Sequence, residues 1–185
     1  MFRTGADVRT ERVDHVDEVL RGQLLRCWVD VTNAGGAVGF VPPVVDADVA
    51  PVLDELVARV TAGAALLCVL RVDGRAAGFA TIALNRNPLL QHWGHVYRVQ
   101  VHPGLQGRGL GTVLLQSVHR IAADEGLEML VLSVRGGTGR EDFYRRLGYQ
   151  EYGRLPGEVR VSPGDDREGI YLYVQLAPQL AASPT

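Results

Sequence analysis

The sequence predicts an α/β (α+β) fold in which helices cover a mixed β-sheet, and two observations support this class. Apolar arms at about residues 64–71 and 76–84 flank Asp73-Gly74, the strongest short-range signal for a hairpin between antiparallel strands. Farther along, a strand, a glycine loop, a helix and a second strand follow one another within about 40 residues. This order is typical of a right-handed βαβ unit, whose two strands are parallel. Both kinds of pairing in one chain predict a mixed sheet.

Two helices are expected before the hairpin. Apolar residues recur at helical spacing from Val13 to Val31, with Gly22 as a candidate break. Asp46 or Asp48 is expected to cap a second helix, which has Pro51 in its first turn.

The second half of the chain supplies the remaining elements. Strands are expected at residues 95–101, 127–134 and 171–176, and a short helix at 141–147. The helix after the glycine loop is expected to bury one apolar face, formed by Leu110, Val113, Leu114, Val118 and Ile121.

Length and composition favour one domain. At 185 residues and 46% hydrophobic content, we expect a single domain over residues 1–178 and a disordered tail at 179–185. The net charge of −2, with no long block of one sign, argues against nucleic acid as a partner. No segment approaches the roughly 18 apolar residues of a membrane span, and the N-terminus has no apolar signal region. We therefore expect a cytoplasmic protein with no membrane partner.

The cysteines and histidines do not predict a metal site. Cys27 and Cys68 lie in apolar segments, which favours buried thiols in a reducing compartment. His15, His92 and His119 show no ligand spacing with one another or with cysteine. We expect no bound metal.

The stretch HPGLQGRGLG, residues 102–111, places four glycines and Arg108 between an expected strand and an expected helix. The first amides of a helix lack partners and carry positive potential, and glycines let a phosphate approach the backbone. Arg108 adds a charge that suits a phosphate oxygen. The stretch therefore predicts a phosphate or pyrophosphate cradle, with a simple connecting turn as the alternative. It is neither a Walker A loop nor a good Rossmann fingerprint.

The same residues carry a family resemblance. The run from Gln106 to Gly111 matches the Q/R-x-x-G-x-G/A motif of the GCN5-related N-acetyltransferases (the GNAT family), and it follows the strand VYRVQVHP as in that family. Residues 143–149, FYRRLGY, resemble the family's second motif. The chain resembles the family over roughly residues 8–176. GGAVGFV, GRLPGEVRVSPGD and IYLYVQL make it most similar to tabtoxin-resistance-like acetyltransferases.

The resemblance implies the GNAT fold and its co-substrate, acetyl-CoA. The fold is a mixed, mostly antiparallel sheet of six to seven strands, with a central parallel pair that splays apart and about four flanking helices. The glycine loop would hold the pyrophosphate of acetyl-CoA, and the preceding strand would pair with its pantetheine arm. The implied contact residues are Val99, Gln100, Val101, Gln106, Gly107, Arg108, Gly109, Leu110, Gly111, Thr112, Phe143 and Tyr144. Val99 and Val101 also fit a purely structural role in the core.

The resemblance also implies a catalytic acid. Tyr144 matches the family tyrosine that protonates the departing thiolate of coenzyme A. An ordinary tyrosine pKa of about 10 keeps the phenol protonated at neutral pH. The alternative is a packing residue on a short amphipathic helix.

The base is less clearly marked. Many family members carry a glutamate on the strand before the glycine loop, but residues 95–101 contain no carboxylate. His95 begins that strand, and its imidazole could accept an ammonium proton directly or through water. Tyr97 is expected on the same strand face, and Ser133 stands where related enzymes can carry an acidic group. Water leading to solvent is the alternative acceptor of the proton, and a hydrogen-bonded surface group is the alternative role for His95.

The expected function is transfer of the acetyl group of acetyl-CoA to a primary amine of a small molecule by direct attack. Loops at residues 33–45, 85–95 and 153–168 are expected to bind the acceptor. Alternatives are a protein lysine or N-terminal acetyltransferase, and a non-catalytic sensor that binds acyl-CoA. Many family members dimerise, which makes a homodimer possible. Asp165, Asp166 and Glu168 predict a solvated acidic turn, with attraction of a cationic substrate as the alternative.

Overall fold

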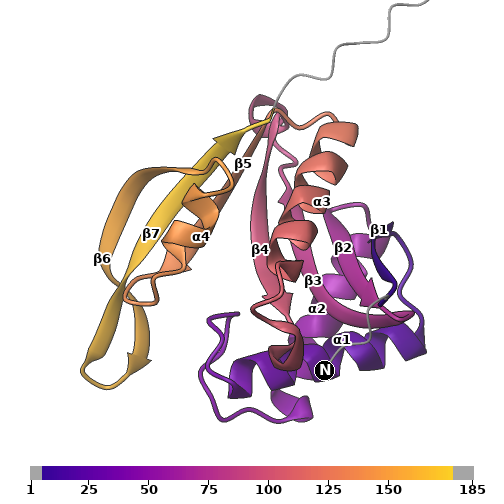
Figure 1. Cartoon of the computed structure of the whole chain (residues 1–185). Coiled ribbons are helices and arrows are strands. Elements are labelled where there is room, and N and C mark those ends of the chain that lie inside the picture. Colours follow the sequence, from indigo (N-terminus) through magenta and orange to yellow (C-terminus); the bar gives the residue numbers. More distant parts are fainter. Residues whose placement is uncertain (1–5, 177–185) are drawn as a thin grey trace, which may run out of the picture.

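The computed structural model describes residues 6–176, and seven strands form one sheet in the order β1-β2-β3-β4-β5-β7-β6 (Figure 1). The strands are β1 (Val8–Val13), β2 (Ala65–Val72), β3 (Arg75–Leu84), β4 (Trp93–Val101), β5 (Met129–Arg135), β6 (Gln150–Ser162) and β7 (Asp165–Gln175). The helices are α1 (Glu18–Asn33), α2 (Asp46–Thr61), α3 (Leu110–Asp124) and α4 (Glu141–Arg145). The expected tail, residues 179–185, lies outside the described residues.

The sheet is mixed, as predicted. Neighbouring strands are antiparallel except β4 and β5, which are parallel. Asp73 and Gly74 both have positive φ, +50° and +78°, as a tight hairpin turn between β2 and β3 requires. The parallel pair is joined at three positions only, from Trp93↔Met129 to His95↔Val131. Beyond them β4 and β5 diverge, which confirms the splayed pair (Figure 1).

Apolar side chains pack on both faces of the sheet. On one face, buried residues of α3, including Leu114 and Val118, pack against β2, β3 and β4, and the same apolar cluster continues onto β5 and β7. On the other, buried residues of α1 and α2, such as Trp28 and Leu53, pack against β2 and β3. Val113 is a correction to the predicted α3 face, since 38% of its surface is exposed. Leu115 lies on the other flank of the buried stripe and is buried in its place.

The helices before the hairpin differ in detail from the prediction. α1 passes through Gly22 without a break and begins at Glu18, where the Asp17 side chain accepts a hydrogen bond from the backbone N–H of Leu20 at 2.7 Å. α2 begins after Val45, so neither Asp46 nor Asp48 is its N-cap residue. The Asp48 carboxylate instead accepts a hydrogen bond from the backbone N–H of Val45 at 2.8 Å.

Pro51 lies in the second turn of α2 rather than the first. It is tolerated there at the loss of one helical backbone hydrogen bond.

Strand β6 corrects the loop expected at residues 153–168. It forms a long hairpin with β7 at the edge of the sheet, and its residues are mostly exposed. An edge strand open to solvent shows no apolar alternation, and Pro156 falls at an irregularity in its register, where no ladder hydrogen bond is needed. These properties concealed the strand in the sequence.

Candidate active site

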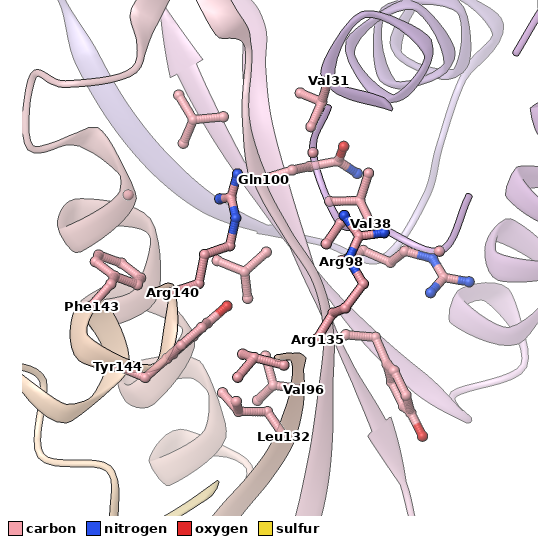
Figure 2. A pocket seen from close by; sticks show the side chains of 18 of the residues that line it. Val31, Val38, Val96, Arg98, Gln100, Leu132, Arg135, Arg140, Phe143 and Tyr144 are labelled. Atoms are coloured by element: carbon pink, nitrogen blue, oxygen red, sulfur yellow. The ribbon is translucent and has the colours of Figure 1, made fainter. Parts of the chain in front are cut away.

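A cavity of about 1040 Å³ lies where β4 and β5 diverge. Its walls come from residues 36–41 between α1 and α2, 96–101 on β4, 106–107 and 109–112 at the start of α3, 132–135 on β5, and 159–160 on β6, with Arg140, Phe143 and Tyr144 around α4. Elements distant in the sequence therefore meet at one site (Figure 2).

A bulge bends β4 away from β5. Arg98 has φ +58°, a left-handed conformation rare outside glycine, and the register with β3 shifts between Phe79 and Thr81. The ladder with β5 stops at His95. The edge of β4 from Val96 onward therefore has no strand partner on the β5 side and faces the cavity, as backbone pairing with an extended ligand requires.

Gln100 lies on the same stretch and is 3% exposed. Both polar atoms of its side-chain amide are buried without a hydrogen-bond partner. Such groups are costly to bury, so they mark a place where a polar ligand would be stabilised.

The glycine loop opens onto this cavity. Gly107 and Gly109 have φ of +74° and +78°, and Gly109 is the N-cap residue of α3. A Cβ at Gly111 would lie 3.4 Å from the Phe143 ring, an ordinary contact distance, so α3 and α4 pack closely at this point. The Gln106 side chain donates a hydrogen bond to the carbonyl of Val101 at 2.8 Å and ties the loop to the end of β4.

Most of the residues expected to contact acetyl-CoA line this cavity. They are Val99, Gln100, Val101, Gln106, Gly107, Gly109, Leu110, Gly111, Thr112, Phe143 and Tyr144. Arg108 is not among the lining residues, and its guanidinium donates a hydrogen bond to the carbonyl of Gly104 at 3.2 Å.

Tyr144 directs its hydroxyl into the cavity (Figure 2). Its ring meets Phe143 and Tyr149 edge to face, with centroids 5.1 Å and 5.6 Å away. Tyr149 is fixed in turn by a 3.1 Å hydrogen bond between its hydroxyl and His119 Nε2. Burial raises the pKa of Tyr144 to about 12, so its phenol is protonated at neutral pH.

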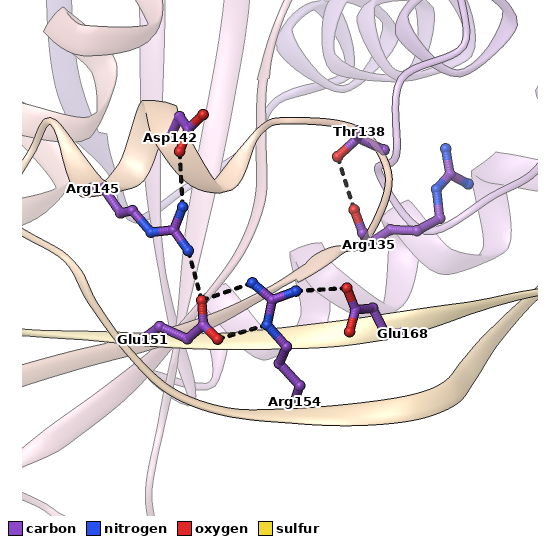
Figure 3. Close-up of polar contacts among 7 residues, drawn as sticks. All are labelled: Arg135, Thr138, Asp142, Arg145, Glu151, Arg154 and Glu168. Carbon is purple, nitrogen blue, oxygen red and sulfur yellow. Dashed lines mark hydrogen bonds and ion pairs between the residues drawn. The ribbon is translucent and has the colours of Figure 1, made fainter.

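Ion pairs hold α4 against the β6–β7 hairpin (Figure 3). Asp142 pairs with Arg145 at 2.8 Å, and Arg145 with Glu151 at 2.6 Å. Arg154 joins Glu151 at 2.6 Å to Glu168 at 2.7 Å. We call these five residues the α4 network. Surface pairs are individually weak, but a network can fix the helix that carries Phe143 and Tyr144.

The contribution of the α4 network to thermal stability should depend on pH in acidic solution. The hydrogen bonds from Arg154 and then Arg145 lower the pKa of Glu151 from 4.5 to about 2. Its stabilising effect is therefore complete above pH 4.5 and is lost as the pH falls towards 2. We expect Glu151→Gln to lower the melting temperature at pH 7, and the difference from the unmodified protein to vanish towards pH 2. Thermal melts across this range, with Glu128→Gln as a control outside the network, check this. A difference independent of pH would contradict it.

His95 lies beside the cavity and does not line it. Its ring stacks on Tyr97, with centroids 4.1 Å apart and planes 8° from parallel, so the two share a strand face as expected. Nε2 is buried without a hydrogen-bond partner, and burial lowers the pKa of the imidazole. Tyr97 and Ser133 do line the cavity. The direct contact between His95 and an acceptor, which the sequence allowed, has no support in this arrangement.

Three arginines on the cavity wall were not anticipated. Arg98 stands at the β4 bulge, Arg135 ends β5, and Arg140 precedes α4. The sequence could have indicated Arg135, because it directly follows the expected buried strand at residues 127–134. The end of that strand lies beside the glycine loop. For Arg98 there was none, since the bulge overrides the alternation of the strand.

The expected acidic turn is also corrected. Asp165 and Asp166 lie in β7 and pair with Arg167 and Arg160, and Glu168 pairs with Arg154. These carboxylates are neutralised and do not form an open site for a cation.

The cysteines are buried free thiols, as expected. Among residues 6–176, no group of three or more histidine, cysteine or acidic residues is placed to hold a metal ion. Within the same range, no helix is both long and apolar enough to cross a membrane.

Comparison with known proteins identifies the family to which this chain belongs. Residues 41–149 match the model of the Acetyltransferase (GNAT) family, so the chain belongs to the GNAT family of acetyltransferases. An uncharacterized N-acetyltransferase of Methanocaldococcus jannaschii is 29% identical over 96 residues, which cover 50% of this chain and 42% of that protein. The chain thus spans less than half the length of that relative.

Solved structures show the same fold. A candidate phosphinothricin N-acetyltransferase superimposes with a TM-score of 0.74 at 17% identity, covering 92% of this chain and 99% of the other. A candidate acetyltransferase from Salmonella typhimurium, solved with acetyl-CoA, gives 0.71 at 21% identity, covering 96% and 99%. The expected GNAT fold, a mixed sheet of six to seven strands with a splayed parallel pair and about four helices, is confirmed, with seven strands and four α-helices among residues 6–176.

Proposed function

We propose that this protein is an N-acetyltransferase that moves the acetyl group of acetyl-CoA to a primary amine of a small molecule by direct attack. The observation that carries this proposal is the cavity between β4 and β5. The glycine loop lies at its α3 end, and the Tyr144 hydroxyl points into it.

The cavity fits acetyl-CoA, the co-substrate that the family uses. Left-handed glycines at the start of α3 leave room for phosphate oxygens at amides that lack helical partners. The unpartnered edge of β4 at Val99–Val101 suits the amides of a pantetheine arm, and the orphaned Gln100 amide lies in the same stretch. Phe143 packs over Gly111 and closes this side.

Tyr144 would protonate the sulfur as the thioester bond breaks. A general acid must be protonated at the working pH and lie within reach of the leaving group. Its raised pKa of about 12 supplies the first condition. Its place in the cavity wall supports the second.

Direct attack is favoured because the cysteines offer no usable nucleophile. Neither Cys27 nor Cys68 lines the cavity, and burial raises the pKa of the Cys27 thiol to about 12. A thiol in that state does not form the thiolate needed for an acyl-enzyme. Ser133 does line the cavity, but the described lining includes no histidine or carboxylate to activate it.

For the base, we propose that His95 takes the ammonium proton through an intervening water, because its ring stacks on Tyr97, which lines the cavity, and does not line the cavity itself. The lowered pKa leaves the imidazole neutral and able to accept a proton at pH 7. We expect His95→Gln to reduce kcat/KM at pH 7 by at least about tenfold. It should also remove the decline in rate that protonation of His95 causes on the acid side.

The pH dependence of kcat/KM for both forms is the measurement, with His92→Gln as a control for an exposed histidine. If His95→Gln left kcat/KM and its pH dependence unchanged, solvent and not His95 would be the acceptor of the proton.

Coenzyme A release from acetyl-CoA tests the function, with the purified chain and a panel of small amines and peptides. Turnover with small amines supports the proposal. Turnover with peptides alone would favour a protein acetyltransferase. Tight binding of acetyl-CoA without turnover would indicate a sensor.

A further inference from the structure

The cavity wall carries an unbalanced positive charge. The described residues that line it include four arginines, Arg98, Arg135, Arg140 and Arg160, and no aspartate, glutamate or lysine. Arg160 is neutralised by Asp166 at 2.7 Å. The other three guanidinium groups make no ion pair with the described residues. A pocket built this way favours an anion and repels a second cation.

The positive charge of Arg140 is explained by its place next to the proposed acetyl-CoA site. Arg140 directly precedes α4, whose Phe143 contacts the glycine loop at Gly111. Figure 2 shows its side chain extending into the cavity from that wall. The phosphates of acetyl-CoA, which rest on the same loop in the proposed function, would balance this charge.

Arg98 and Arg135 lie on the opposite face of the sheet from α3. Leu132 and Val134 of β5 pack into the core beneath α3, so the alternation of the strand sends Ser133 and Arg135 to the other face. The side chain of Arg135 extends from the end of β5 into the cavity (Figure 2). Arg98 reaches that face too, since its guanidinium lies 4.8 Å from the ring centre of Trp28 in α1.

Contacts with α1 and with the loop that follows it hold the Arg98 side chain in place. The Trp28 indole beneath it donates a hydrogen bond to the carbonyl of Val38 at 2.9 Å, which ties it to the loop over the cavity. A Cβ at Gly39 would come within 2.9 Å of the Arg98 guanidinium, so the loop closes tightly upon it. Its Nε is buried without a hydrogen-bond partner. Burial lowers the pKa of Arg98 although the Glu55 carboxylate acts against this, so an anion that joins the guanidinium would stabilise its charge further.

We infer that the acceptor is an amine of amino-acid size that carries a carboxylate, and that Arg135 and Arg98 bind this carboxylate while the amine faces the thioester. This rests on the proposed function and names its substrate class. The nearby carboxylates of β7 are paired already, so they offer no counter-charge for a polyamine or a lysine-rich peptide.

The same two arginines have a second effect on the reaction. A positive charge near an ammonium group lowers its pKa and favours the neutral amine that can attack. This effect partly replaces the carboxylate base that β4 lacks.

Matched pairs of acceptors test the inference. Coenzyme A release is measured with a panel of α-amino acids and with the α-amide of each. The amide has the less basic amine and is thus richer in the reactive form, so a preference for the acid must come from binding. We expect the acids to be the better substrates.

Variants assign the preference to residues. We expect Arg135→Gln to raise the KM for the amino acid about 10- to 100-fold, with the KM for acetyl-CoA unchanged, and to remove the preference over the amide. Arg98→Gln should do the same. Arg98→Gln also loses the contact of the guanidinium with Trp28. If that variant does not fold, Arg98→Lys, which keeps a positive charge, takes its place. Arg26→Gln, an exposed arginine on α1, is the matched control.

Binding gives a second readout. Calorimetric titration of the protein and coenzyme A with N-acetyl-L-leucine and with its α-amide should show tighter binding of the acid, lost in Arg135→Gln. Turnover confined to amines without an anionic group, or a preference untouched by both arginine variants, would overturn the inference and leave the proposed function standing. No turnover with any amine or peptide would overturn both.

Discussion

Gly109→Val is expected to weaken acetyl-CoA binding by at least about 100-fold. Gly109 has φ +78° at the N-cap of α3, a conformation that costs a residue with a side chain about 1–2 kcal/mol. The new methyl groups would also occupy the space in which a phosphate meets the first amides of the helix. Calorimetric titration with acetyl-CoA measures the loss directly.

A control separates strain from the loss of the cradle. Gly63 follows α2, has φ +64°, and has open space where a side chain would stand. Gly63→Val should cost comparable thermal stability and leave the affinity for acetyl-CoA intact. If Gly109→Val bound acetyl-CoA as well as the unmodified protein, the glycine stretch would be no more than a turn.

Tyr144→Phe is expected to lower kcat by about 100- to 1000-fold while the affinity for acetyl-CoA stays within a factor of about two. The substitution keeps the ring contacts with Phe143 and Tyr149 and removes only the proton donor. Because the pKa of Tyr144 is about 12, no decline in kcat from its ionisation should occur below pH 10. Steady-state rates from pH 6 to pH 10 and a binding titration provide the measurement.

Tyr149→Phe is the matched control, since Tyr149 packs against Tyr144 and does not line the cavity. Loss of its hydrogen bond to His119 should cost about 1 kcal/mol of stability with little change in kcat. Equal losses of kcat in both variants would show that Tyr144 acts by packing and not as an acid.

The sequence was most informative where one local conformation had a strong requirement. Asp73-Gly74 and the run from Gln106 to Gly111 need left-handed backbone or close approach, and few residue types satisfy either condition. Both features were placed correctly, and with them the hairpin and the parallel pair. Tyr144 followed from the family motif and does lie in the cavity wall.

The remaining features depend on contacts between distant segments. Strand β6 is held by β7 and by ion pairs such as that of Arg154 with Glu168, which no periodicity reveals. The bulge at Arg98 follows from the way β3 pairs with β4, so the stacking of its guanidinium on Trp28 was not visible in the sequence. His95 was placed on the correct strand and face, but its position outside the cavity wall depends on where β4 leaves β5, since the ladder ends at His95 and the wall begins at Val96.

The division between β4 and β5 has a consequence for the resistance of the protein to heat. Only three residue pairs join β4 to β5. These pairs are therefore the whole strand pairing between β1–β4 on one side of the gap and β5, β7 and β6 on the other. A ligand lying in the gap supplies bonds that a continuous ladder would have made within the protein. Because an unfolded chain offers no such gap, a ligand at 100 times its Kd adds about 2.7 kcal/mol to the free energy of unfolding. Bound acetyl-CoA would then link the two parts of the sheet, so it would stabilise the fold as well as supply the acetyl group.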